Sequence, residues 1–142
     1  MRQVLVAIDP SSEARIRSAV AEAVRLHLQE PVHVRLVRVQ PRVTSHVAMF
    51  FGVRELHDLQ QQCGAEDLKL AQALLQAAGV PFTSTVLVGR SAETIAQAAR
   101  DFGCDRIVLG EPGTGLAGKV FGSLAQQVRH LLGPDDAQVI GS

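Results

Sequence analysis

Short apolar runs alternate with longer amphipathic segments along the whole chain, and this alternation restricts the fold more than any other feature. The apolar runs have the length of strands, and the first and fourth are nearly uninterrupted, as in strands covered on both faces. The predicted strands are residues 3–9, 32–39, 82–88, 106–109 and 137–140, and the predicted helices are 12–29, 55–78, 91–102 and a segment that begins at Ser123. Strands that alternate with helices indicate a parallel sheet with right-handed crossovers and helices on both faces.

Local signals refine the ends and faces of the predicted helices. Ser11 or Ser12 is expected to cap the first helix, because a hydroxyl there can accept from an unpaired amide of the first turn. Gly79 is expected to end the second helix. Within that helix, Cys63 falls on the apolar side of the pattern and Gly64 is expected to weaken the middle.

These elements predict an α/β fold: a three-layer, doubly wound sandwich with a five-stranded, mostly parallel sheet and four helices. We expect the strand order 3-2-1-4-5, because the two loops richest in site chemistry, residues 9–12 and 110–123, then face each other. In such sheets a ligand binds at the carboxyl ends of the strands, where the strand order reverses. The sequence therefore predicts a site between the first and fourth strands.

A glycine-rich segment follows the fourth predicted strand. Five glycines lie between residues 110 and 122, and Ser123 opens a capping box with Gln126 for the last helix. Glycines allow backbone N–H groups to approach a ligand closely, and a helix N-terminus carries partial positive charge. Together these features favour an anion site, most often a phosphate site, over a surface loop without a ligand.

A nucleoside-triphosphatase P-loop is one alternative for this segment. Gly113, Gly118 and Lys119 fit the spacing G-x-x-x-x-G-K, but Val120 stands where Ser or Thr must ligate Mg²⁺. A valine cannot coordinate a metal ion. We therefore expect the match to be a coincidence.

The chain resembles the universal stress protein family over its whole length. Gly110-x-x-Gly113, followed by Gly122-Ser123, resembles the nucleotide-binding signature G-x2-G-x9-G-(S/T) of that family. Residues 4–9 resemble its opening strand, which ends in Asp, and residues 88–95 and 105–110 resemble its segments VGxPxEAI and DLIVMG. The combined pattern is more specific than the glycines alone.

The resemblance implies a Rossmann-like fold of the adenine nucleotide alpha hydrolase type, a single domain over residues 1–142, and ATP as the ligand, with or without Mg²⁺. It also implies a stress-response role through conformation and partner contact, in a homodimer formed through the last strand. The implied site consists of Ala7 and Val39 in the adenine pocket, Asp9 at the ribose or adenine edge, Gly110, Gly113, Gly122 and Ser123 at the ribose and phosphates, and Lys119 as a further phosphate contact or a solvated lysine.

Two alternatives stay open beside this nucleotide-binding module. Eight residues separate Gly113 from Gly122, one fewer than in the family pattern, and Glu111 and Pro112 fill the first gap. A carboxylate repels phosphate and proline lacks an N–H donor, so a dimeric interaction protein with a degenerate loop is one alternative. The other is a slow ATPase in which Asp9 places Mg²⁺.

Composition and residue spacing argue against several other classes of protein. Fourteen basic residues balance fourteen acidic ones, which leaves no basic excess to bind nucleic acid or an anionic membrane. The first apolar run is too short to be a signal peptide or membrane span. Cys63 and Cys104 are far apart and the five histidines form no metal-ligand motif, so we expect a reduced, cytoplasmic protein without a metal. No activated nucleophile or catalytic carboxylate pair is evident, so we expect at most a weak ATPase.

Overall fold

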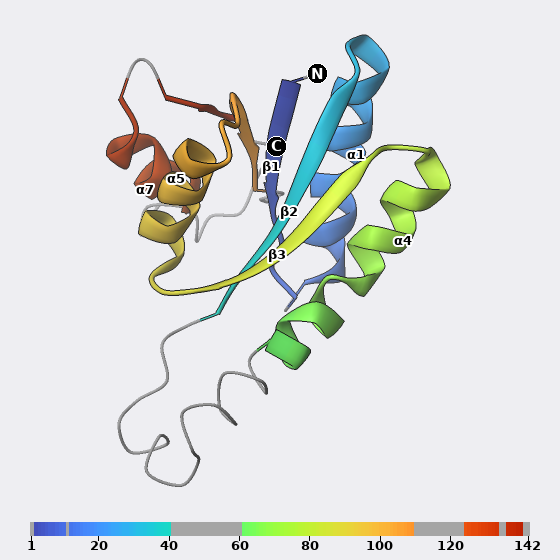
Figure 1. Cartoon of the computed structure of the whole chain (residues 1–142), viewed down its shortest axis with the longest axis horizontal. Helices are drawn as coiled ribbons and strands as arrows, with labels where there is room; N and C mark the ends of the chain where they lie inside the picture. The colour runs from blue at the N-terminus through green and yellow to red at the C-terminus, as the bar shows by residue number, and fades with distance from the viewer. Residues whose placement is uncertain (1, 11, 41–60, 110–123, 134–135, 141–142) are drawn as a thin grey trace, which may run out of the picture.

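A central parallel sheet divides the molecule into two helical layers (Figure 1). The computed structural model describes residues 2–10, 12–40, 61–109, 124–133 and 136–140, and the description below concerns these residues. The elements in chain order are β1 (Arg2–Ala7), α1 (Glu13–Gln29), β2 (Val32–Gln40), α4 (Lys69–Ala78), β3 (Phe82–Val88), α5 (Ser91–Asp101), β4 (Arg106–Val108), α7 (Leu124–Leu131) and β5 (Gln138–Ile140).

The five strands have the order β3-β2-β1-β4-β5, and all four neighbouring pairs are parallel. This confirms the predicted strand order and fold class. The chain builds outward from β1 through β2 to β3, and then crosses back to place β4 on the other side of β1. The strand order therefore reverses at β1.

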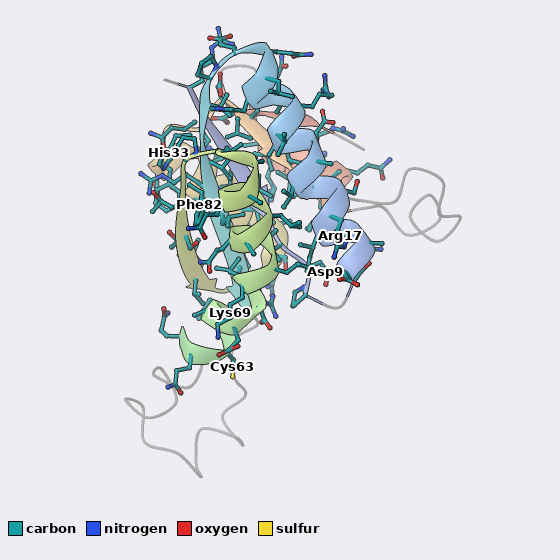
Figure 2. The ribbon with its side chains drawn as sticks, turned by 90° about the vertical axis from the view of Figure 1, so that its right-hand side faces the viewer. Asp9, Arg17, His33, Cys63, Lys69 and Phe82 are labelled. Atoms are coloured by element: carbon teal, nitrogen blue, oxygen red, sulfur yellow. The ribbon has the colours of Figure 1, made fainter. Side chains whose placement is uncertain are left out.

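Strand β1 is buried on both faces from Val4 to Ala7, which explains its nearly uninterrupted apolar sequence. Val4 and Val6 face the layer of α1 and α4, whereas Leu5 and Ala7 face the layer of α5 and α7. Alternate side chains of a strand point to opposite faces, so one short run supplies both cores. Figure 2 looks onto the α1 and α4 layer, which covers one face of the sheet.

The helix ends follow the capping signals of the sequence. Ser12 is the N-cap of α1, and its hydroxyl accepts a hydrogen bond from the Arg15 amide at 3.2 Å. Gly79 ends α4 in the left-handed conformation, with φ of +73°, which glycine adopts without steric cost. Both predictions are confirmed. Ser123, predicted to cap the last helix, lies outside the described residues.

The second predicted helix differs from its expectation in two respects. Residues 61–67 are helical, a turn at Leu68 follows, and α4 then begins at Lys69, so the described part is two segments. Cys63 is exposed, and the buried side chains are instead Leu68, Ala71 and Leu75. The buried positions Gly64, Leu68, Ala71 and Leu75 follow helical spacing across the turn, so the buried face is offset from the one on which Cys63 was placed.

Candidate functional site

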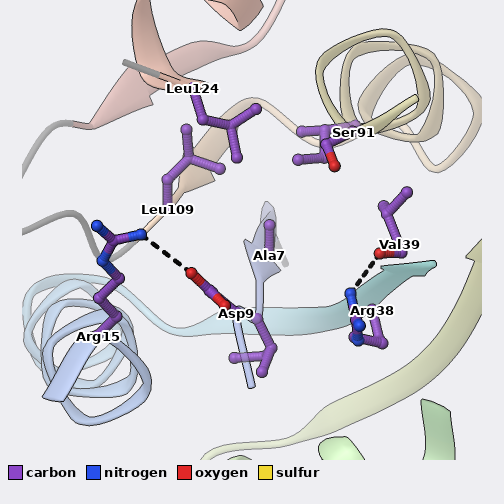
Figure 3. A pocket seen from close by; sticks show the side chains of 10 residues that line it. Ala7, Asp9, Arg15, Arg38, Val39, Ser91, Leu109 and Leu124 are labelled. Carbon is purple, nitrogen blue, oxygen red and sulfur yellow. Dashed lines mark hydrogen bonds and ion pairs between the residues drawn. The ribbon is translucent and has the colours of Figure 1, made fainter. Parts of the chain in front are cut away.

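A hollow of about 230 Å³ lies at the carboxyl ends of β1, β2 and β4 (Figure 3). This is the position that the strand order predicts for a ligand site, because the order reverses at β1. The described residues that line the hollow are Ala7, Ile8, Asp9, Arg15, Arg38, Val39, Ser91, Ile95, Leu109 and Leu124.

The hollow opens where β1 ends and β2 continues. The last paired residues of the two strands are Ala7 and Val37, and the Ile8 amide still donates to the Val37 carbonyl at 2.9 Å. Strand β2 extends three residues further, to Gln40. Alternate residues of a strand direct their main-chain groups to the same side, so Val39 directs its N–H and C=O groups toward the side of β1, beyond the last paired residue.

Asp9 is tied to the first turn of α1. Its carboxylate accepts a hydrogen bond from Arg15, with 3.0 Å between Oδ2 and Nη1, and its carbonyl accepts from the Ser12 amide at 3.3 Å. The side chains of Arg15 and Asp9 are 42% and 38% exposed. An ion pair this exposed contributes at most about 1 kcal/mol to stability. The pair therefore matters more for the charged groups that it places at this side of the hollow than for the stability of the fold.

Arg38 is held from two directions at the opposite wall. Its Nε donates to Asp67 Oδ2 at 3.0 Å, and its Nη1 donates to the carbonyl of Val39. Asp67 belongs to the helical segment 61–67, so this ion pair connects that segment to the end of β2. Figure 3 shows Arg15 and Arg38 on opposite sides of the hollow, with Ala7 and Asp9 between them.

Two helices begin at the rim of the hollow. Ser91 is the first residue of α5 and Leu124 is the first residue of α7, and both line the hollow. The turn from β3 into α5 passes through Gly89, where φ is +154° and an added Cβ would lie 2.5 Å from Thr94 Oγ1. Unpaired amides at a helix start carry partial positive charge, so the start of α5 favours an anionic group at the rim.

The structure brings three of the sequence-predicted site residues together: Ala7, Asp9 and Val39. The other five, Gly110, Gly113, Lys119, Gly122 and Ser123, lie outside the described residues. Leu109 and Leu124, which flank that segment on either side, both line the hollow. The described residues on both sides of that segment therefore reach the hollow.

Sequence reasoning missed the two arginines and Ser91. Arg15 carries a detectable signal, because it follows the capping residue Ser12 by one helical turn and so lies near the tip of β1. Arg38 is harder to identify, since its role depends on Asp67, which is distant in sequence. Ser91 occupies the position of the proline in the segment that resembles VGxPxEAI.

The model of the universal stress protein family matches residues 1–132. The chain belongs to the universal stress protein family. Similar solved structures include universal stress protein UspA from Lactobacillus plantarum, with a TM-score of 0.71 and 23% identity over 98% of this chain and 95% of that one. No curated protein sequence matches the chain significantly.

Two further similar structures are complexes with a nucleotide. The universal stress protein from Archaeoglobus fulgidus in complex with dAMP has a TM-score of 0.66 and 20% identity, and the match covers 99% of this chain and 96% of that one. A universal stress protein family protein from Arabidopsis thaliana with AMP bound has a TM-score of 0.64 and 15% identity, over 99% and 90% of the two chains. At these identities the likeness establishes the shared fold.

Two other properties of this universal stress protein bear on its chemistry. Within the ranges that the structure describes, no three His, Cys, Asp or Glu side chains lie close enough to hold a metal ion, and no helix has the length and apolar character needed to cross a membrane. Burial raises the pKa of the Cys104 thiol to about 11, with a smaller opposing effect from Arg35. Cys104 lies two residues before β4, at the amino end of that strand and away from the hollow, and its thiol is protonated at neutral pH.

Proposed function

We propose that this universal stress protein binds an adenine nucleotide, ATP with or without Mg²⁺, in the hollow between β1 and β4. The observation that carries the proposal is that Ala7, Asp9 and Val39 line one hollow at the point where the strand order reverses. The dAMP and AMP bound in two similar structures support an adenine nucleotide as the ligand. The whole chain, residues 1–142, would act as one domain.

Each wall of the hollow suits a different part of a nucleotide. Ala7 and Val39 offer apolar surface to a base, and Val39 can add main-chain hydrogen bonds at its edge. Asp9 can accept hydrogen bonds from ribose hydroxyls. The hollow of about 230 Å³ is smaller than the roughly 300–1,000 Å³ of a site that encloses a drug-sized ligand. We infer that it holds the nucleoside part.

In this proposal the phosphates extend toward the flanks of the glycine-rich segment. Leu109 and Leu124, the described residues on either side of that segment, line the hollow. The segment supplies Gly110, Gly113, Gly122 and Ser123 as amide and hydroxyl donors, and Lys119 as a further cation. Eight residues in place of nine between Gly113 and Gly122 would shorten this cradle.

We propose that the bound nucleotide controls conformation and partner contact in a stress response, rather than being turned over rapidly. Among the described residues that line the hollow, Ser91 has a hydroxyl, but no His or Cys lies beside it to activate it. A slow ATPase would need Asp9 to place Mg²⁺, and Asp9 already pairs with Arg15. Phosphate release that disappears in Asp9→Ala would favour the ATPase.

Chromatography of the small molecules released on denaturing the purified protein tests the proposal. We expect adenine nucleotide in stoichiometric amount, or a rise in melting temperature when ATP and Mg²⁺ are added to nucleotide-free protein. Asp9→Asn should weaken this response, whereas Asp101→Asn, a matched change at the exposed end of α5, should not. A protein that carries no nucleotide and shows no shift would favour the dimeric interaction protein instead.

We also propose a homodimer through β5. This strand is at the edge of the sheet and pairs with β4 on one side, so its other side can pair with a second copy. Light scattering behind a sizing column measures the mass in solution. We expect the mass of two chains. A mass that corresponds to a single chain at micromolar concentration would exclude this dimer.

A further inference from the structure

We propose that Arg15 is a specificity-determining residue that makes the hollow prefer a nucleoside 5′-phosphate over the corresponding nucleoside. The inference rests on the proposed function, since it concerns the same site, and it adds a phosphate contact from outside the glycine-rich segment. Arg15 lies in the first turn of α1 and lines the hollow.

The guanidinium group of Arg15 lies at one side of the hollow. In Figure 3 Arg15 lies on the side of Leu109, and across the hollow from Val39 and Arg38. The sheet requires the same arrangement, because β2 and β4 lie on opposite sides of β1. If the base contacts Val39, the phosphate of a bound nucleotide extends toward Leu109. Arg15 is therefore on the phosphate side.

The hollow is lined by both acidic and basic groups. Among its described lining residues, Asp9, Arg15 and Arg38 carry formal charge. Without Arg15, the Asp9 carboxylate would repel a phosphate group that approached from this side. Arg38 does not take over this function, because Asp67 and the Val39 carbonyl already engage it at the opposite wall. Among the described lining residues, Arg15 is thus the cation that offsets this repulsion.

Arg15 has hydrogen-bonding capacity beyond its contact with Asp9. A guanidinium group has five N–H donors in a planar fork. The structure records one side-chain contact for it among the described residues, from Nη1 to Asp9. The pair is half-exposed, so this contact constrains Arg15 only weakly. Asp9 therefore orients the group, while donors on the same fork can bind a phosphate oxygen, with which arginine forms strong, often bidentate contacts.

Affinity measurements with two ligands test the inference. Isothermal titration of the full-length protein with AMP and with adenosine gives the ratio of the two affinities. We expect Arg15→Met to lower the affinity for AMP by about 10-fold or more and that for adenosine by about 2-fold or less, because a charge-assisted hydrogen bond is lost with AMP alone. Arg15→Lys should retain part of the preference, since it keeps the charge but not the fork.

Arg17 provides the matched control on the same helix. It pairs with Glu13 at 3.1 Å on the exposed surface of α1 and does not line the hollow (Figure 2). Arg17→Met removes the same charge from the same helix and should leave the AMP-to-adenosine ratio unchanged. A ratio that falls equally in both variants would mean a general effect of net charge and would overturn the inference.

Two further outcomes separate this inference from the proposed function. If Arg15→Met weakens AMP and adenosine equally, Arg15 acts only by positioning Asp9, so the inference is wrong while the nucleotide site stands. If the wild-type protein binds neither ligand, the proposed function is wrong and the inference falls with it. Increasing salt should lower AMP affinity in the wild type and have less effect in Arg15→Met.

Discussion

Gly64 lies where the helical segment 61–67 passes close to β3. A Cβ atom added there would be 2.4 Å from Cγ1 of Val86, far inside van der Waals contact. The glycine is also buried. Its presence in a helix therefore reflects a close approach between helix and strand, whereas from sequence alone it is only a weak helix former.

This contact predicts whether a substitution at Gly64 raises or lowers the free energy of unfolding. In an unconstrained helix Gly→Ala stabilises by about 0.5–1 kcal/mol. We expect Gly64→Ala to destabilise this protein by about 1–3 kcal/mol, because Val86 must move. Urea unfolding measures the change. The double variant Gly64→Ala/Val86→Ala should be more stable than the sum of the two single effects implies, and additive effects would contradict the contact.

Cys104 gives a prediction for alkaline pH. Burial raises its pKa from about 9 to about 11, so between these values the unfolded chain loses the thiol proton while the folded chain keeps it. The folded state then binds more protons, and stability falls as pH rises from about 9 toward 11, by at most about 3 kcal/mol. Below pH 9 the thiol contributes no pH dependence.

The check is urea unfolding at pH 8.5, 9.5 and 10.5, compared with Cys104→Ala. We expect the wild type to lose stability faster than the variant over this range, because the variant lacks the thiol. Parallel pH profiles would show that Cys104 does not ionise differently in the two states. The exposed Cys63 should react with a thiol reagent at neutral pH well before Cys104 does.

At the scale of elements, the first turn of α1 connects folding to the site. The Ser12 hydroxyl caps the Arg15 amide, and the Ser12 amide donates to the Asp9 carbonyl. One capping residue thus fixes both partners of the ion pair at the hollow. A change there should affect stability and the site together.

Ser12→Ala tests this connection. We expect a loss of about 1 kcal/mol in the free energy of unfolding, because an amide of the first turn loses its acceptor. Ser12→Asp keeps an acceptor at the N-cap and should restore most of that stability. Thermal or urea unfolding of both variants provides the measurement. Equal destabilisation by Ala and Asp would contradict the capping contact.

The features of the helices and strands that the sequence predicted are those that depend on neighbouring residues in the chain. Ser12 and Gly79 act on their own helix ends, so the sequence alone predicted them. The turn at Leu68 was not predicted, because the apolar spacing of 55–78 is compatible with one continuous helix. The pairing of Arg38 with Asp67 also could not be predicted, since these residues are 29 positions apart in the chain and meet only when two elements pack together.

At the scale of the whole molecule, alternating elements and the two distinctive loops led to the correct fold class and strand order. The position of the candidate site follows from that order, since parallel strands place their carboxyl ends at one edge. The hollow itself could not be read from the sequence. It depends on β2 extending beyond the last residue of β1, and on two helices starting at its rim.

The same topology makes the central claim directly measurable. A nucleotide in the hollow would contact the carboxyl ends of the strands, whereas Gln3, His33 and Asp105 lie at or near the amino ends. The two ends of the sheet therefore serve as site and internal control in a single experiment.

The measurement is a titration of isotope-labelled protein with ATP and Mg²⁺, followed by backbone amide shifts in NMR spectra. The account predicts saturable shifts concentrated at Ala7, Asp9, Val39 and Ser91, with little change at Gln3 and His33. Unchanged spectra at millimolar nucleotide, or shifts concentrated at the amino ends of the strands, would contradict it.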